Sequence, residues 1–187
     1  ETAEAEGATV DVVYPEAATA DAQIKVLDNL ISQQPDAICI SANDVNALQA
    51  KLEEAMDAGI KVSSFDSAPN KDSRQVFVNQ AGTQAVGQAL MDAVLDISGG
   101  EGQFAILSAT SQSANQDNES ACKLTGLGLP SEMQEYTGDD DAHSCPYFYL
   151  WDMEGLGKLS AYATMALVKG DITGAVDETF TAGDMGE

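Results

Sequence analysis

Residues 37–66 read AICISANDVNALQAKLEEAMDAGIKVSSFD, and this stretch decides the fold class. It opens on an apolar run typical of a buried strand over 37–41 and closes on a second such run over 60–65. Between them the pattern predicts a helix over 44–58, which Asn43 or Asp44 caps and Gly59 ends. Its apolar face carries Val45, Leu48, Leu52 and Met56. A strand, a helix and a strand at this spacing indicate a βαβ unit with parallel strands.

The same alternation continues on both sides of this stretch. Further strands are expected over 9–14, 76–79 and 104–107, and further helices over 18–33 and 81–97. Strands that alternate with helices predict a parallel sheet covered by helices on both faces, because right-handed crossovers place the helices there. The sequence therefore predicts a doubly wound α/β domain.

The alternation breaks after residue 118. A strand is expected at 122–125, a short helix near 131–136, an aromatic strand over 146–151 and a long helix over 155–168. The Gly- and Thr-rich residues 171–187 are expected to form terminal strands. The abrupt join at 117–121 predicts that a segment of the fold is missing there, and the opening residues 1–4 predict that the chain continues before Glu1.

The charge balance limits the partners of this protein. Thirty-one acidic residues against 8 Lys and Arg give a formal net charge of -23 over 187 residues. Such a field repels nucleic acid backbones and anionic bilayers, which argues against a nucleic-acid function.

The three cysteines, Cys39, Cys122 and Cys145, have no spacing typical of a zinc site. Cys39 lies in an apolar run and is expected to be buried and inert. Cys122 and Cys145 form a disulfide only if the fold brings them within reach, which the sequence leaves open.

Polar residues follow the predicted strands, where ligands bind in open parallel sheets. SAND follows the second strand, Asp66 and Ser67 follow the third, and residues 108–118 (SATSQSANQDN) follow the fifth. These segments are rich in hydroxyl, amide and carboxylate groups. A carboxylate accepts from hydroxyls and an amide both donates and accepts, so the expected ligand is polyhydroxylated.

Four segments in this order carry a resemblance to a known family: SFDS at 64–67, NQ at 115–116, GLGLPSEM at 126–133 and LWD at 150–152. The chain resembles the type I periplasmic sugar-binding proteins of ABC transporters, and more narrowly the branch that binds rhamnose or autoinducer-2. The resemblance implies two Rossmann-like doubly wound lobes joined by a three-strand hinge. It also implies that the first strand and the core of the second lobe are absent here.

The resemblance divides the chain into residues 1–118 for the N-terminal lobe, 122–150 for part of the C-terminal lobe, and 151–187 for the hinge return and a helix on the N-terminal lobe. It implies a ligand site made of Asp66, Asn115, Gln116, Asp152, Trp151 and Leu150. Structural alternatives stay open: Asp66 and Asp152 are placed to cap helices, and Asn115 and Gln116 suit a loop. Trp151 also suits a core.

The resemblance implies a non-enzymatic protein without cofactor or metal that binds a small sugar or autoinducer-2 outside the cytoplasm and delivers it to an ABC permease. A monomer is expected, with any lipid anchor outside this sequence. The alternative is the sensing domain of a LacI-type regulator, or of a chemoreceptor or kinase partner, with the same fold. An enzyme is disfavoured because the sequence has no GxSxG, no Walker A and no nucleophile beside the single histidine.

Overall fold

The computed structural model describes residues 1–101, 125–128, 130–134, 136–138 and 145–185. The chain divides into two compact units, which are described separately. The first comprises Glu1–Gln80 together with Glu154–Glu187, and the second comprises Ala81–Met153.

The first unit is built on a parallel sheet of three described strands. Their order is β1 (Ala37–Ile40), β2 (Lys61–Phe65) and β3 (Val76–Val78), so neighbouring strands in the sequence are neighbours in the sheet. Ile38 pairs in register with Val62, and Ser63 with Val76. The strands predicted over 37–41, 60–65 and 76–79 are therefore confirmed to within a residue at each end.

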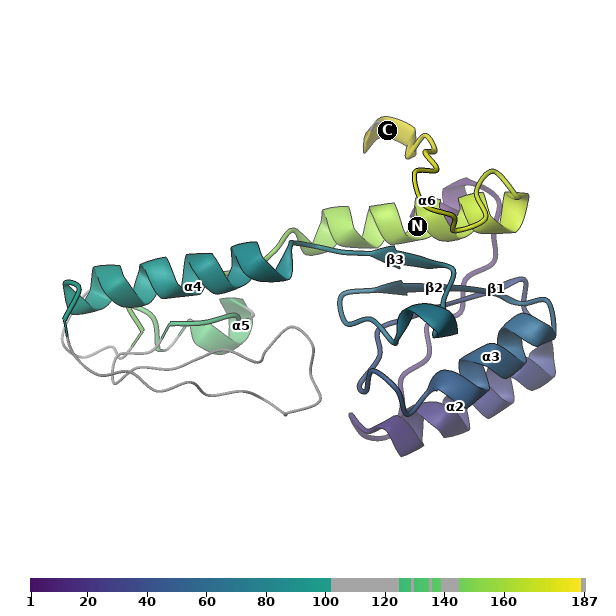
Figure 1. Ribbon diagram of the computed structural model, residues 1–187, viewed down its shortest axis with the longest axis horizontal. Coiled ribbons are helices and arrows are strands. Elements are labelled where there is room, and N and C mark those ends of the chain that lie inside the picture. The colour runs from purple at the N-terminus through teal and green to yellow at the C-terminus, as the bar shows by residue number, and fades with distance from the viewer. Residues whose placement is uncertain (102–124, 129, 135, 139–144, 186–187) are drawn as a thin grey trace. The chain divides into compact units, whose positions relative to one another are not determined.

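Two helices cover one face of this sheet, α2 (Ala20–Gln33) and α3 (Gln49–Asp57) (Figure 1). Thr19 caps α2, because its hydroxyl accepts from the backbone N–H of Ala22. The main apolar core lies between these helices and the sheet. It consists of Leu27, Ile31, Ile38, Ala42, Leu48, Leu52, Ala55, Ile60 and Val62.

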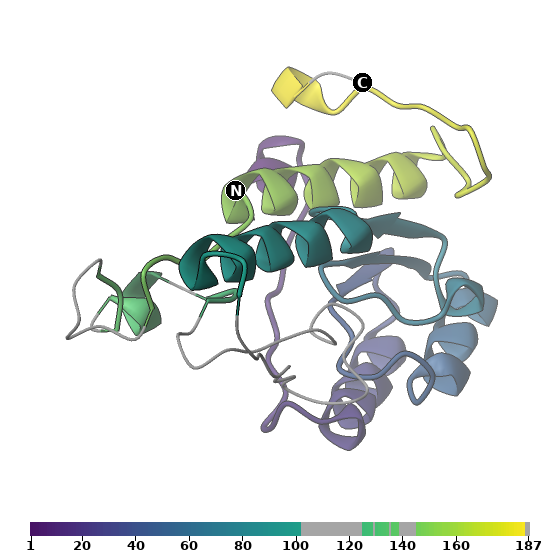
Figure 2. The ribbon, with the colours of Figure 1, turned by 60° about the vertical axis from the view of Figure 1, so that its left-hand side comes forward.

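Helix α6 (Met153–Lys169) covers the opposite face, and the layering is seen again after rotation in Figure 2. Its buried residues Ala166 and Leu167 pack with Ile172 and with Val76 of β3. A buried polar contact joins the layers, since the hydroxyls of Ser63 and Thr164 lie 2.6 Å apart. The predicted doubly wound arrangement is thus confirmed, with helices on both faces of a parallel sheet.

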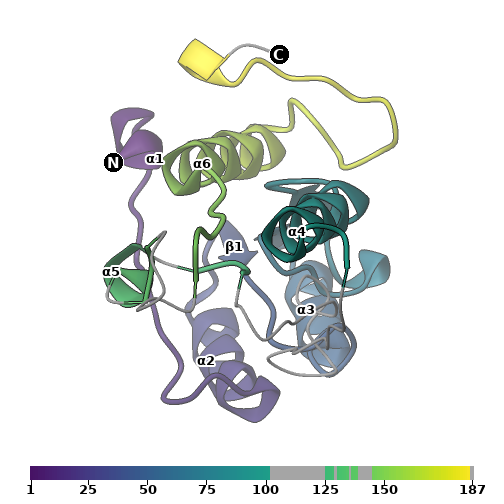
Figure 3. The same cartoon turned by 90° about the vertical axis from the view of Figure 1, so that its left-hand side faces the viewer.

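Residues 9–14 do not form the expected strand. After the short helix α1 (Thr2–Ala5), the chain runs without regular structure to α2 (Figure 3, purple). Val12 is 72% exposed and Tyr14 is 82% exposed. A β-branched run becomes a strand only when a neighbouring strand pairs its N–H and C=O groups, and no described strand pairs with this one.

The terminal strands expected over 171–187 are also absent from the described residues up to 185. A local turn satisfies this backbone instead, because the carboxylate of Glu178 accepts from the N–H groups of Thr173, Gly174 and Ala175. These bonds hold the pKa of Glu178 below its usual value. The short 3-10 helix η2 (Gly183–Met185) follows.

Helix α3 begins at Gln49, five residues after the predicted start at Asp44. The Asp44 carboxylate does accept from the N–H groups of Asn46 and Ala47, as a cap would. However, the carbonyl of Val45 accepts from the N–H of Asn70 at 2.7 Å. That carbonyl is therefore engaged by a neighbouring loop, and residues 45–48 form a turn.

Cys39 is exposed, which corrects the expectation of a buried thiol. Cys39 is in register with Ser63, and Ser63 is in register with Val76, so the three side chains lie on the same face of the sheet. This is the face that α6 covers. Ser63 is fully buried, whereas Cys39 lies on β1, at the end of the described strand order. Its apolar neighbours Ile38 and Ile40 point to the other face.

The second unit contains α4 (Thr83–Ser98) and the short α5 (Pro130–Met133). The expected strand over 146–151 is reduced to one isolated bridge, between Leu127 and Tyr149, and a second bridge joins Thr137 and Cys145. Cys145 is buried, and its thiol donates to the carbonyl of Tyr147 at 3.3 Å. The expected strand over 104–107 lies outside the described residues.

Candidate functional site

Three polar side chains meet where the strands of the first unit end. Ser41, Asp66 and Gln80 follow β1, β2 and β3 respectively, and parallel strands bring these ends to one edge. The Ser41 hydroxyl donates to Oδ2 of Asp66 at 3.1 Å. The Gln80 amide donates to Oδ1 of the same carboxylate at 3.0 Å. We call Ser41, Asp66 and Gln80 the edge cluster.

Asp66 is a half-buried carboxylate held in an unusual backbone conformation. Its φ of 58° lies in the left-handed region, which a residue other than glycine enters at some cost and which is found often at functional sites. Burial raises the pKa of Asp66 above its usual value, and the hydrogen bond from Ser41 opposes this rise. Both the left-handed backbone and the burial of the carboxylate cost free energy, and the fold nevertheless places Asp66 at this edge.

The Gln23 side chain of α2 holds the loop that carries Ser41. This α2 residue is only 9% exposed, and its amide donates to the carbonyl of Ser41 at 2.7 Å. Its carbonyl oxygen accepts from the N–H of Asn43 at 2.9 Å. One buried amide therefore satisfies two backbone groups of a loop without regular structure, and it sets the position of the Ser41 hydroxyl.

The loop after β2 is joined to the loop after β1. The N–H of Ala42 donates to the carbonyl of Ser67 at 2.8 Å. The Asn70 amide donates to the side chain of Gln49 at 2.9 Å, and its oxygen accepts from the hydroxyl of Ser73 at 2.9 Å. These contacts hold the loops after β1 and β2 to each other, and a preformed binding site requires such support.

The predicted site residues are distributed over both units. Asp66 lies in the first unit, and it caps no helix, because Asn70 caps the next one (η1, Lys71–Ser73). Leu150, Trp151 and Asp152 lie in the second unit. Asn115 and Gln116 fall outside the described residues.

Within the second unit the three predicted residues differ in exposure. Leu150 is 40% exposed, and Asp152 is exposed immediately before α6. The indole Nε1 of Trp151 is buried and has no hydrogen-bond partner among the described residues. A buried N–H without an acceptor is rare in native proteins.

Gln80 was not expected from the sequence. Its position could have identified it, because Gln80 lies two residues after β3, as Asp66 lies directly after β2.

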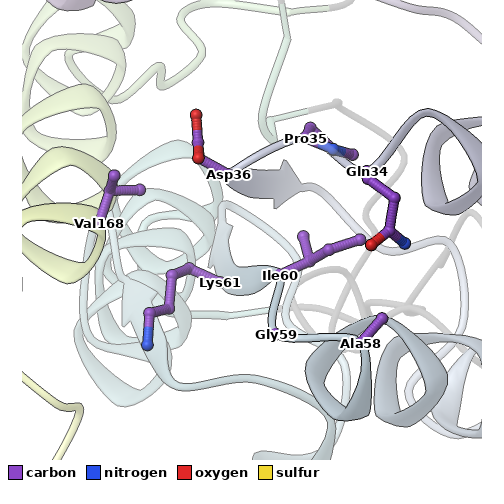
Figure 4. A pocket seen from close by; sticks show the side chains of 8 residues that line it. All are labelled: Gln34, Pro35, Asp36, Ala58, Gly59, Ile60, Lys61 and Val168. Atoms are coloured by element: carbon purple, nitrogen blue, oxygen red, sulfur yellow. The ribbon is translucent and has the colours of Figure 1, made fainter.

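A pocket of about 320 Å³ lies at the opposite edge of the sheet (Figure 4). It is lined by Gln34, Pro35, Asp36, Ala58, Gly59, Ile60, Lys61 and Val168. The charged side chains of Asp36 and Lys61 point in opposite directions in Figure 4 and do not converge on one ligand position. The edge cluster is therefore the better candidate site.

Neither a metal-holding cluster nor a membrane-spanning helix is found in the described part of the chain. In that part of the chain, no group of three or more His, Cys, Asp or Glu side chains is arranged to hold a metal ion. None of the helices found there combines the length and apolar character needed to cross a membrane.

The chain is similar to a known protein family and to several solved structures. Residues 1–122 match the family described as the periplasmic binding protein domain. A solute-binding protein of an ABC transporter from Clostridium phytofermentas, solved with bound L-rhamnose, is 41% identical with a TM-score of 0.89. The match covers 96% of this chain and 78% of that protein.

Two further solved structures are similar over different extents. A sugar ABC transporter protein from Actinomyces odontolyticus is 30% identical with a TM-score of 0.74, over 99% of this chain and 81% of its own. A solute-binding protein from Burkholderia graminis, in complex with D-arabinose, is 25% identical with a TM-score of 0.56. That match covers 62% of this chain and 39% of the other.

Proposed function

This chain belongs to the periplasmic binding protein domain family, and from that membership we propose that it binds a small neutral sugar for an ABC importer. Its partners are then the sugar and the transporter permease, and it works outside the cytoplasm without catalysing a reaction. The similar proteins described above are transport proteins, which favours this function over a regulator or a chemoreceptor.

The observation that carries the proposal is the edge cluster. Ser41 and Gln80 each donate to one oxygen of Asp66 and so hold in place a carboxylate whose oxygens act as acceptor sites. Sugar hydroxyls are donors that suit such sites, and hydrogen bonds to a charged acceptor are the stronger kind. A carboxylate held in this way would repel an anionic ligand, so the proposed sugar is neutral.

We assign the remaining contacts to residues that match the motifs of related sugar-binding proteins. Asn115, Gln116 and Asp152 would bind ligand hydroxyls, and Trp151 and Leu150 would cover the apolar face of the ring. The proposed division into lobes is 1–118 and 122–150, with 151–187 as the hinge return. Rhamnose, as bound by the similar Clostridium protein, is the first ligand to test.

We further propose that the protein acts as a monomer, with any lipid anchor supplied by residues outside this sequence. The high negative charge of -23 favours separate chains in solution through mutual repulsion.

Calorimetric titration with L-rhamnose and D-arabinose tests the function. The wild type should bind one of these sugars, and Asp66→Ala and Asp152→Ala should each weaken that binding strongly while the fold is retained. Leaving ligand hydroxyls without partners in a buried site costs roughly 1–3 kcal/mol apiece, or about tenfold or more in affinity. Asp36→Ala is the matched control, because this exposed carboxylate lies at the opposite edge of the sheet. Full affinity in both folded Asp66 and Asp152 variants would refute the site.

A further inference from the structure

The two polar atoms of the Gln80 side chain have different surroundings. Nε2 donates to Oδ1 of Asp66 at 3.0 Å. Oε1 is buried and has no hydrogen-bond partner among the described residues. A buried acceptor without a donor costs roughly 1–3 kcal/mol, and native structures rarely leave one in this state.

The chemistry of its neighbour fixes the orientation of this amide. An ionised carboxylate only accepts hydrogen bonds, so the amide must turn its nitrogen towards Asp66 and its oxygen away. Rotating the amide to satisfy Oε1 would place two acceptor oxygens against each other. The missing donor must therefore come from another group.

We infer that Gln80 is a further ligand-binding residue, whose Oε1 accepts from one hydroxyl of the sugar while its Nε2 holds Asp66 to accept from another. The inference rests on the proposed function, since it names an additional contact in the same site. Because Gln80 is bound to Asp66, its Oε1 is a second acceptor group beside the carboxylate. Two hydroxyls on one small ring are the kind of ligand that meets acceptors placed this close together.

The test combines protein variants with modified ligands. L-rhamnose and its monodeoxy derivatives are titrated into the wild type, Gln80→Met and Gln80→Glu, and melting curves monitor the fold. Gln88→Met is the matched control, because Gln88 also donates its amide to an aspartate (Asp92, 2.7 Å) but lies exposed on α4.

Both Gln80 variants should weaken rhamnose binding by about tenfold or more, and the control should leave it unchanged. For a direct contact, one deoxy derivative should lose affinity for the wild type but bind Gln80→Met as well as rhamnose does. If every derivative loses the same factor for both proteins, or if Gln80→Glu binds as the wild type does, the inference is overturned. A wild type that binds none of a panel of neutral sugars would overturn the proposed function itself, which is a distinguishable result.

Discussion

The backbone of Gly174 lies against that of Gln75 so closely that a Cβ at position 174 would overlap the carbonyl oxygen of Gln75. Gln75 is in turn bound to the sheet. Its backbone N–H donates to the carbonyl of Val62 at 2.8 Å, and its side-chain oxygen accepts from the N–H of Val62 at 2.9 Å. The segment after α6 is thus docked onto the residue that leads into β3.

Replacing Gly174 by alanine should destabilise the first unit by more than about 2 kcal/mol, because it combines a backbone overlap with a left-handed φ of 91°. Gly170→Ala is the control: its φ is 80° but no atom lies within 4 Å of the added Cβ. That variant should cost only about 1 kcal/mol. Urea unfolding measures both, and equal losses would contradict the close packing of Gly174.

The hydroxyl pair between the sheet and α6 has a definite direction. Thr164 donates to the carbonyl of Ser160 at 2.7 Å, so its oxygen must accept from the hydroxyl of the fully buried Ser63. Thr164→Val should therefore cost more than Ser63→Ala, because it leaves a buried donor without an acceptor, by roughly 1–3 kcal/mol.

The double variant should be more stable than the sum of the two single losses predicts, since the residues contact each other. Chemical unfolding of all four proteins gives the coupling energy. Strictly additive losses would show that the hydrogen bond contributes nothing.

Gln23 should affect stability and binding together. Gln23→Leu keeps the size of the side chain but leaves the carbonyl of Ser41 and the N–H of Asn43 without their partner, at a cost of about 2–4 kcal/mol in total. Loosening this loop should also lower the affinity for the sugar. Gln33→Leu, exposed on the same helix, serves as the control and should change neither the urea midpoint nor the titration.

Asp66 should make stability and binding depend on pH in opposite directions. Burial raises the pKa of Asp66 in the folded protein above its usual value, so the folded state holds the proton more tightly than the unfolded chain. The protein therefore loses stability as the pH rises from the pKa of Asp66 in the unfolded chain through its pKa in the folded protein. Over the same pH range Asp66 becomes ionised, and the ionised form is the acceptor that the sugar needs. Asp66→Asn should melt at a higher temperature than the wild type at pH 7, and the difference should vanish at pH 3.

On acidification, the wild type should lose sugar affinity at a higher pH than a site with an ordinary aspartate would, because the pKa of Asp66 is raised. Melting curves and titrations at several pH values check both effects. An Asp66→Asn protein that is less stable at pH 7, or that retains full affinity there, would refute this account of the carboxylate.

The sequence predicted those parts of the fold that depend on local pattern. The strands predicted over 37–41 and 60–65 and the helix predicted over 18–33 follow from apolar periodicity, and each is observed to within two residues. Residues 9–14 satisfy the same pattern, yet they form no strand, because pairing depends on a neighbouring segment that a local pattern does not contain.

The site was predicted in part for a similar reason. Asp66 was identified from its position after a strand and from its motif, and the structure places it at the carboxyl edge. Its partner Gln80 and its supporting residue Gln23 lie 14 residues after it and 43 residues before it along the chain. No spacing rule connects residues that meet only through the order of strands in a sheet.

The exposed residues between α1 and α2 have a consequence for handling the protein. Val10, Val12, Val13 and Tyr14 present exposed apolar surface, and β1 has no partner on one side among the described strands. Such an edge invites self-association, and the net charge of -23 opposes it at neutral pH. Acid buffers protonate the carboxylates and high salt screens them, so both conditions should promote self-association of this protein.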